Sequence, residues 1–256
     1  MKNILSRSSR DVLQQFAWSN VLLAFDYDGT LAPIVVDPAR AAMRRSTREL
    51  LHALTQLYPV VVISGRAQPD ALRRLRGSGV LEVIGNHGIE PRHSAERHIA
   101  DVERWLPVLN RRLSGFRGVT IEDKIYSVAL HYRRSRQKQE ARAAILAAAA
   151  ELVGARVIGG KQVINILPAG APHKGIALER ERNRLGHATA IYVGDDETDE
   201  DVFGLDQPGR LVGVRVGADR RSRASYYVRS QAKIDDLLEV LLNLRQQPPL
   251  DTTAAS

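Results

Sequence analysis

The chain has 256 residues, 44% of them apolar, which is enough hydrophobic material for one large globular domain or two smaller ones. It contains no cysteine, which excludes disulfide bonds and a thiolate nucleophile. Residues 1–7 lack the apolar segment of a signal peptide, so we expect none, and no apolar run reaches membrane-spanning length. Its net charge of +8 comes from scattered arginines that do not alternate with aromatic residues, which are only 5% of the chain. We therefore expect a cytoplasmic protein without a nucleic-acid or membrane partner, whose positive charge suits an anionic substrate.

The first part of the chain alternates helices with short, fully apolar strands. The apolar periodicity predicts helices over 9–18, 40–58 and 69–75, and strands over 21–25, 60–63 and 80–84. Unbroken apolar strands of this kind are typical of a parallel sheet that is buried on both faces. This part therefore predicts a doubly wound α/β fold.

The pattern changes after residue 90. We expect helices over 102–113 and 136–153, strands over 119–123 and 127–132, and a hairpin of 156–158 with 162–167 around Gly159 and Gly160. Strands that follow one another in this way predict an antiparallel α+β unit inserted into the α/β domain. The α/β rhythm then returns with helices over 173–185 and 234–244 and strands over 190–193 and 210–216.

The expected domain boundaries follow from this change of pattern. We assign residues 1–90 and 169–246 to the α/β core and residues 91–168 to the inserted unit. Residues 247–256, with their proline and threonine content, are expected to be a disordered tail.

Two carboxylates directly follow the first apolar strand, in the sequence Asp26-Tyr27-Asp28-Gly29. Open α/β sheets bind their ligands at the carboxyl ends of the strands. Two carboxylates this close repel each other unless a cation lies between them or one keeps its proton. An ordinary Asx turn is the alternative, whereas a calcium loop would need glycine at its sixth position, which is Leu31. The pair indicates Mg²⁺ binding, proton transfer or both.

Other predicted strands also end in polar side chains. Ser64 follows the second strand, Lys174 opens the helix after the insertion, and Asp195, Asp196 and Asp199 follow the strand over 190–193. Alone, each is an ordinary turn or helix-start residue. Together they supply the nucleophile, proton donor, cation site and positive charge that phosphoryl transfer requires.

Each role can be assigned from the chemistry. Asp26 would attack phosphorus and form an aspartyl-phosphate, and Asp28 would act as general acid and then as general base. Mg²⁺ would take Asp26, Asp195 and the carbonyl of Asp28 as ligands. The remaining residues would hold the transferring oxygens, in the case of Ser64 and Lys174, or orient the metal's waters, in the case of Asp196 and Asp199.

Four segments resemble the motifs of the haloacid dehalogenase (HAD) superfamily: residues 25–31, 63–66, 173–175 and 194–200. Within it, residues 85–88 and 122–133 are similar to segments of the trehalose-6-phosphate phosphatase family, the second to its cap-domain signature. The resemblance implies a Rossmann-like HAD core with an inserted cap. It also implies a Mg²⁺-dependent phosphomonoesterase of trehalose biosynthesis, which hydrolyses trehalose 6-phosphate.

The resemblance also implies a set of substrate contacts. The cap signature contributes Glu122 and Lys124, and the wider set of expected substrate-binding residues is Arg66, His87, Glu122, Lys124, His131, Arg133 and Asn165. The partner is a small-molecule sugar phosphate. A trehalose-6-phosphate synthase would be a pathway partner, without direct binding.

One departure from the family bears on the substrate. The family usually carries Glu-x-Arg/Lys-Pro before the lysine motif, and this chain has Asn165-Ile166-Leu167-Pro168. Asparagine can hydrogen-bond a sugar hydroxyl but carries no charge, and charge-assisted bonds are roughly twice as strong. A phosphatase of sucrose phosphate or of a glycosylglycerate phosphate is therefore the alternative. A phosphomutase is less favoured, because the large cap and Asp28 suit hydrolysis. A non-catalytic regulator is less favoured, because Asp26, Asp28, Lys174 and Asp195 are all present.

Overall fold

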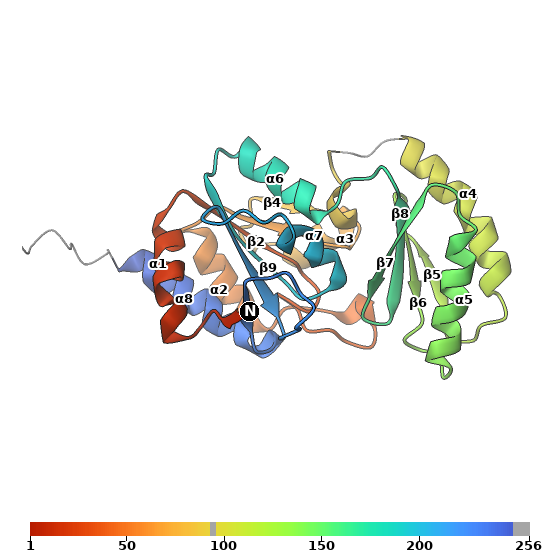
Figure 1. Cartoon of the computed structure of the whole chain (residues 1–256), viewed down its shortest axis with the longest axis horizontal. Helices are drawn as coiled ribbons and strands as arrows, with labels where there is room; N and C mark the ends of the chain where they lie inside the picture. The colour runs from red at the N-terminus through yellow and green to blue at the C-terminus, as the bar shows by residue number, and fades with distance from the viewer. Residues whose placement is uncertain (93–95, 248–256) are drawn as a thin grey trace, which may run out of the picture.

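The structure is a computed structural model that describes residues 1–92 and 96–247. Within them the chain forms a seven-stranded parallel sheet and a separate four-stranded antiparallel sheet (Figure 1). The expected disordered tail, except Gln247, lies outside the described residues. In the described part of the chain, no helix combines the length and apolar character needed to cross a membrane.

The parallel sheet places the first apolar strand between two neighbours that also carry predicted site residues. From edge to edge it consists of β1 (Lys2–Asn3), β11 (Tyr226–Val228), β10 (Leu211–Val216), β9 (Thr189–Gly194), β2 (Val21–Phe25), β3 (Val60–Ile63) and β4 (Glu82–Ile84). All the pairings are parallel. The carboxyl ends of β9, β2 and β3 therefore lie side by side at one edge.

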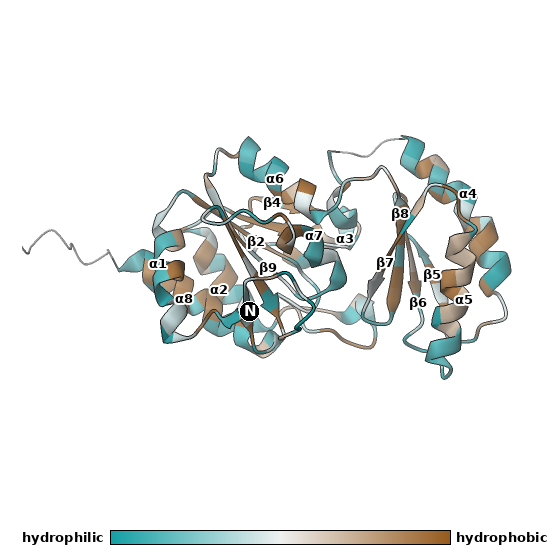
Figure 2. Ribbon diagram, in the orientation of Figure 1, coloured by the Kyte–Doolittle hydropathy of each residue, from teal (hydrophilic) through white to brown (hydrophobic). Residues whose placement is uncertain are grey.

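Every residue of β2 is buried, and its alternating side chains face two helical layers. Leu23 and Phe25 belong to the larger apolar core, whereas Leu22 and Ala24 belong to the core on the opposite face. The first core is completed by α1 (Arg10–Trp18), α2 (Arg45–Thr55), α3 (Gln68–Leu75) and α8 (Ile234–Gln246), and the second by α6 (Lys174–Arg184) and α7 (Glu200–Phe203). Figure 2 shows apolar strands in the centre and helices with hydrophilic outer faces.

The antiparallel sheet has the order β5 (Thr120–Asp123), β6 (Val128–His131), β8 (Val163–Pro168) and β7 (Ala155–Gly160). Helices α4 (Glu96–Leu113) and α5 (Lys138–Ala150) cover the face turned away from the parallel sheet (Figure 1). Val128 and Leu130 of β6 pack with Trp105 of α4 and Ile145 of α5 in a core of their own. The intervening residues of β6 are left on the face toward the parallel sheet. The predicted fold class, an α/β core with an α+β cap, is confirmed; the domain boundaries stay a prediction.

The structure differs from the expected elements at several places. Helix α4 begins at Glu96, six residues before the expected start at 102, and the short helix α7 was not predicted. Strands β1 and β11 were not predicted, because they are only two and three residues long and β1 contains no apolar residue. The helix expected from residue 40 begins at Arg45, after a separate 3-10 turn over Pro38–Arg40 that the Asp37 side chain caps.

A further difference is the cap hairpin, which turns at Lys161 and Gln162 rather than at the two glycines. Gln162 adopts a φ of 65°, in the left-handed region. Gly159 and Gly160 are the last residues of β7, and side chains there would run into the carboxylates of Glu197 and Asp196. The two glycines therefore allow the hairpin to approach the core closely, and they do not form its turn.

Candidate active site

Three strand ends and the start of one helix bring four predicted residues to one place. Asp26 follows β2, and its N–H donates to the carbonyl of Val193 on β9 at 2.8 Å, which keeps the two strand ends in register. Asp195 and Ser64 directly follow β9 and β3. Lys174 is the first residue of α6, where the His173 side chain caps the helix by accepting from two backbone N–H groups.

A buried lysine joins two of the carboxylates. Lys174 Nζ donates to Asp26 Oδ1 at 2.8 Å and to Asp199 Oδ1 at 2.7 Å. The three residues are 1%, 4% and 0% exposed. Burial by itself would lower the pKa of Lys174, but the charges of Asp199 and Asp26 outweigh it and raise the pKa well above its usual value. Lys174 therefore keeps its positive charge inside the protein.

Asp199 organises the loop that carries Asp195. Its Oδ2 accepts from the backbone N–H groups of Asp195 and Asp196, both at 2.8 Å. Its Oδ1 accepts from the Tyr192 hydroxyl at 2.6 Å as well as from Lys174. With both oxygens committed in this way, Asp199 holds the loop and orients its neighbours.

The carboxylates form a group that suits a divalent cation. One oxygen each of Asp26, Asp195 and Asp199 lies within 4.8 Å of the others. Asp195 Oδ2 accepts from Lys161, whereas its buried Oδ1 has no hydrogen-bond partner among residues 1–92 and 96–247. Burial raises the pKa of Asp195 to about 7, although Lys161 acts in the opposite direction. An oxygen-only set with a free, buried oxygen fits Mg²⁺.

Gly29 allows this approach of the two strand ends. Its φ is +84°, in the left-handed region, and a Cβ at this position would collide with the Asp195 carboxylate. The glycine of the Asp-x-Asp-Gly sequence is therefore required both by the turn and by the carboxylate that faces it.

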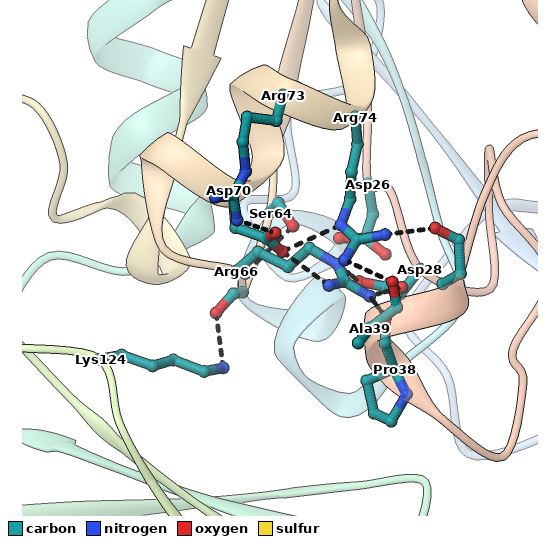
Figure 3. A network of polar contacts seen from close by, with 12 residues as sticks. Asp26, Asp28, Pro38, Ala39, Ser64, Arg66, Asp70, Arg73, Arg74 and Lys124 are labelled. Carbon is teal, nitrogen blue, oxygen red and sulfur yellow. Dashed lines mark hydrogen bonds and ion pairs between the residues drawn. The ribbon is translucent and has the colours of Figure 1, made fainter.

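Asp28 bonds an arginine and is not part of the group formed by Asp26, Asp195 and Asp199. Arg66 donates from Nε to Asp28 Oδ2 at 2.6 Å and from Nη2 to Asp28 Oδ1 at 2.7 Å (Figure 3). Its Nη1 donates to Asp70 Oδ2 at 2.7 Å. The Arg66 backbone N–H donates to Ser64 Oγ at 3.1 Å. The turn after β3 thus binds, through Arg66, the carboxylate of Asp28 in the turn after β2.

A cavity of about 570 Å³ lies over these strand ends, with walls from both sheets. Its lining contains most of the predicted residues, namely Asp26, Asp28, Arg66, His87, Glu122, Lys124, His131, Arg133, Asn165, Lys174, Asp195 and Asp196. Ser64 and Asp199 are buried next to the cavity and are not part of its wall. The fold therefore brings the core and cap residues together around one space.

Several cap side chains in this wall bond to the core or to each other. Glu122 pairs with His131 at 2.7 Å, and Lys124 Nζ donates to the Gly65 carbonyl at 2.9 Å. Arg133 donates to the carbonyls of Val35 in the core and Lys161 in the cap. The cap is thus linked to the core across the cavity by charged groups.

His87 of the core and Asn165 of the cap are both buried in the cavity wall. His87 has a φ of 58°, and its ring packs on Gly65, where a Cβ would collide with it. Burial, followed by the charges of Lys124 and Lys174, holds the pKa of His87 well below 6.5. Neither ring nitrogen of His87 has a hydrogen-bond partner among residues 1–92 and 96–247. His87 is therefore neutral at pH 7.

Leu167 lies in an apolar seam between cap and core. It is fully buried together with Ile89 and Ala171. Opposite it on β7 stands Arg156. The basic residue that the family resemblance leads one to expect at position 167 is thus replaced by an apolar contact.

Three residues of this region were not predicted: Lys161, Asp70 and Tyr192. Lys161 follows two glycines in the cap hairpin, but the sequence does not reveal that this tip reaches Asp195. Asp70 lies in the first turn of α3 with Arg73 and Arg74 three and four residues later, a spacing that does predict ion pairs.

We expect Lys174→Met to destabilise the protein strongly. Removing one member of a buried ion pair leaves uncompensated charge and costs roughly 3–5 kcal/mol. The matched control is Lys233→Met, which breaks a half-exposed pair with Asp236 and should cost less than about 1 kcal/mol. Urea denaturation at pH 7 measures both. Equal losses of unfolding free energy would contradict the buried cluster.

We expect His87→Asn to flatten the dependence of stability on pH. His87 stays neutral in the folded protein but takes up a proton in the unfolded chain below about pH 6.5, so stability is present above that pH and is lost as the pH falls. Asparagine tolerates the left-handed backbone and does not titrate. The measurement is the unfolding free energy at pH 7 and pH 5. If wild type and variant lose the same amount, His87 is not held neutral.

Comparisons with known proteins agree with this geometry. The family model "Trehalose-phosphatase" matches residues 24–232. A trehalose-phosphate phosphatase of Mycobacterium bovis is 31% identical, with 95% of this chain and 68% of that protein covered. The C-terminal domain of a Candida albicans trehalose-6-phosphate phosphatase superposes with a TM-score of 0.76 at 23% identity, over 92% of this chain and 97% of that one.

A HAD subclass IIB sugar phosphatase superposes with a TM-score of 0.57 at 14% identity, over 85% of this chain and 97% of that one. At this identity the likeness concerns the fold alone. The family match, the 31% identical relative and the shared fold lead to one conclusion: the chain is a phosphatase with a HAD fold that belongs to the trehalose-phosphatase family.

Proposed function

We propose that this enzyme hydrolyses trehalose 6-phosphate to trehalose and phosphate, depends on Mg²⁺, and works through an aspartyl-phosphate on Asp26. The observation that carries the proposal is the shared cavity in which Asp26, Asp28 and Lys174 of the core face the polar side of the cap sheet. This arrangement combines a nucleophile, a proton-transfer group and a fixed positive charge with a surface able to bind a sugar.

In the first step, Asp26 would attack phosphorus while the bond from phosphorus to the sugar oxygen breaks, and Asp28 would give its proton to that oxygen. In the second step, a water would attack phosphorus and pass a proton to Asp28, which releases phosphate and regenerates Asp26. Mg²⁺, held by Asp26, Asp195 and the carbonyl of Asp28, would supply positive charge beside the phosphoryl group.

The other core residues would hold this constellation in place. Lys174 presents a permanent positive charge next to Asp26, and it can also meet the phosphoryl oxygens. Ser64 would donate to the same oxygens from the end of β3. Asp196 and Asp199 would orient the metal's waters, and Asp199 additionally fixes Lys174.

Recognition of the sugar is assigned to the cap and the cavity floor. Residues Glu122, Lys124, His131, Arg133 and Asn165 of the cap, with Arg66 and His87 of the core, all line the cavity and carry polar groups. Closure of the cap would exclude bulk water from the aspartyl-phosphate. A cytoplasmic location and a synthase that supplies the substrate remain predictions from the sequence.

A second candidate function is the hydrolysis of another sugar phosphate, such as sucrose phosphate or a glycosylglycerate phosphate. It is favoured by Asn165 and Leu167, because the first is uncharged and the second is buried in the apolar seam. The chemistry at Asp26 would be the same for either substrate.

We expect trehalose 6-phosphate to lead a panel of sugar phosphates in phosphate release with Mg²⁺. Asp26→Asn should abolish turnover with the fold intact, because only the nucleophile is lost, and chelation of the metal should do the same. Circular dichroism checks the fold of the variant. Appreciable turnover by Asp26→Asn contradicts the covalent mechanism, and a different leading sugar identifies the second candidate.

Asn165→Glu should raise kcat/KM for trehalose 6-phosphate several-fold, because a charged acceptor bonds a sugar hydroxyl roughly twice as strongly as a neutral one. Asn110→Glu adds the same charge on the exposed side of α4 and should leave kcat/KM unchanged. An unchanged or lower kcat/KM for Asn165→Glu alone would indicate that the cap recognises another sugar.

A further inference from the structure

The guanidinium of Arg66 is fixed on three sides. Four hydrogen bonds run from it: two to Asp28, one to Asp70 Oδ2, and one to the carbonyl of Pro38 at 2.9 Å. Its side chain is only 12% exposed. A planar guanidinium that is hydrogen-bonded on three sides cannot rotate in its plane. The direction in which Arg66 bonds Asp28 is therefore set by Asp70 and the Pro38 carbonyl.

Asp70 is the charged one of those two partners. Its carboxylate accepts from Arg66, from Arg73 at 2.8 Å and from Arg74 at 2.9 Å (Figure 3). It lies in the first turn of α3, where the helix dipole also favours a negative charge. Burial would raise the pKa of Asp70, but the three arginines outweigh it and hold the pKa below its usual range.

The same network holds the loop after Asp28. Arg74 donates to the carbonyls of Ala39 and Ala41, and Arg66 donates to that of Pro38. This loop belongs to the wall of the cavity. Asp70 thus bonds both Arg66, which contacts Asp28, and Arg74, which holds the loop over residues 38–41. Its own carboxylate bonds none of the reacting groups proposed above.

We propose that Asp70 is a positioning residue for the general acid: it orients Arg66, which in turn holds Asp28 where its proton can reach the leaving oxygen. This inference rests on the role proposed for Asp28. The alternative is that the three arginines and Asp70 only tie α3 to the neighbouring loop. The two readings differ in how the loss of Asp70 depends on the leaving group.

A sugar oxygen leaves poorly without a proton, whereas p-nitrophenolate is a stable anion that leaves without one. General acid catalysis contributes about 10²–10⁴-fold where it is needed. A misplaced acid should therefore lower kcat/KM for a sugar phosphate and spare kcat/KM for p-nitrophenyl phosphate, because kcat/KM reports the step up to cleavage of the ester. General damage to the fold would lower both.

The test compares kcat/KM of wild type, Asp28→Asn and Asp70→Asn with the sugar phosphate that leads the panel, with an alkyl phosphate that carries no sugar, and with p-nitrophenyl phosphate. Because Arg66 and Asp70 also line the cavity, a loss confined to the sugar phosphate would indicate a lost sugar contact and overturn the inference, whereas a misplaced acid lowers kcat/KM for the sugar and alkyl phosphates alike.

We expect Asp70→Asn to lower kcat/KM about 10–100-fold for the sugar phosphate and less than about 3-fold for the aryl phosphate. The loss for the sugar phosphate is smaller than the full effect of removing a general acid, because Asp28 is displaced rather than lost. The control is Asp101→Asn, because Asp101 pairs with Arg104 at i,i+3 on α4 and is 26% exposed, as Asp70 is. It should behave as wild type.

A second comparison tests the route through Arg66. Arg66→Lys replaces the fork by a point charge and should give the same leaving-group-dependent loss. The double variant Arg66→Lys/Asp70→Asn should lose no more than the larger single loss, because both changes disturb one grip on Asp28. Additive losses overturn the inference.

Equal losses of kcat/KM for the sugar and aryl phosphates in Asp70→Asn also overturn the inference. Asp70 then only joins α3 to the neighbouring loop. If Asp28→Asn itself shows no dependence on the leaving group, the acid role proposed for Asp28 fails instead. The failure of the inference and the failure of the proposed mechanism are thereby distinguished.

Discussion

The buried contact of Lys174 with Asp26 and Asp199 is the interaction on which the site depends. Several carboxylates lie at one edge of the sheet. Because they repel one another in a poorly hydrated space, some of them would stay protonated without a nearby positive charge. Lys174 offsets this repulsion from the start of α6, on one face of the sheet. Asp199, held by Tyr192 and two backbone N–H groups, keeps the lysine between the strand ends.

The second constraint is the seam between the two sheets. Charged groups cross it at the cavity, where Lys124 reaches the Gly65 carbonyl and Lys161 reaches Asp195. An apolar contact crosses it at Leu167, which packs with Ile89 of the core. The seam therefore combines charged contacts over the cavity with an apolar contact beside it.

Much of the site could be predicted because parallel strands deliver their carboxyl ends to one edge. Asp26 and Ser64 directly follow fully apolar strands, and Asp195 follows the apolar run over 190–193 after one glycine, so the crevice they share follows from the parallel strands. The grip of Arg66 on Asp28 could not be predicted in the same way. It depends on the depth and direction of two turns that meet only after β2 and β3 have paired.

The sequence by itself determined the α/β core, the inserted cap and the position of the candidate site residues at the strand ends, because apolar periodicity and the ends of buried strands are local properties of the chain. Tertiary structure alone decided which cap residues face the core. Lys161 reaches Asp195 from a hairpin tip whose direction no local pattern encodes. Asp70 reaches Arg66, and through it Asp28, from a helix whose packing places the three side chains together. Contacts between distant segments depend on how the elements pack, which is a property of the whole fold.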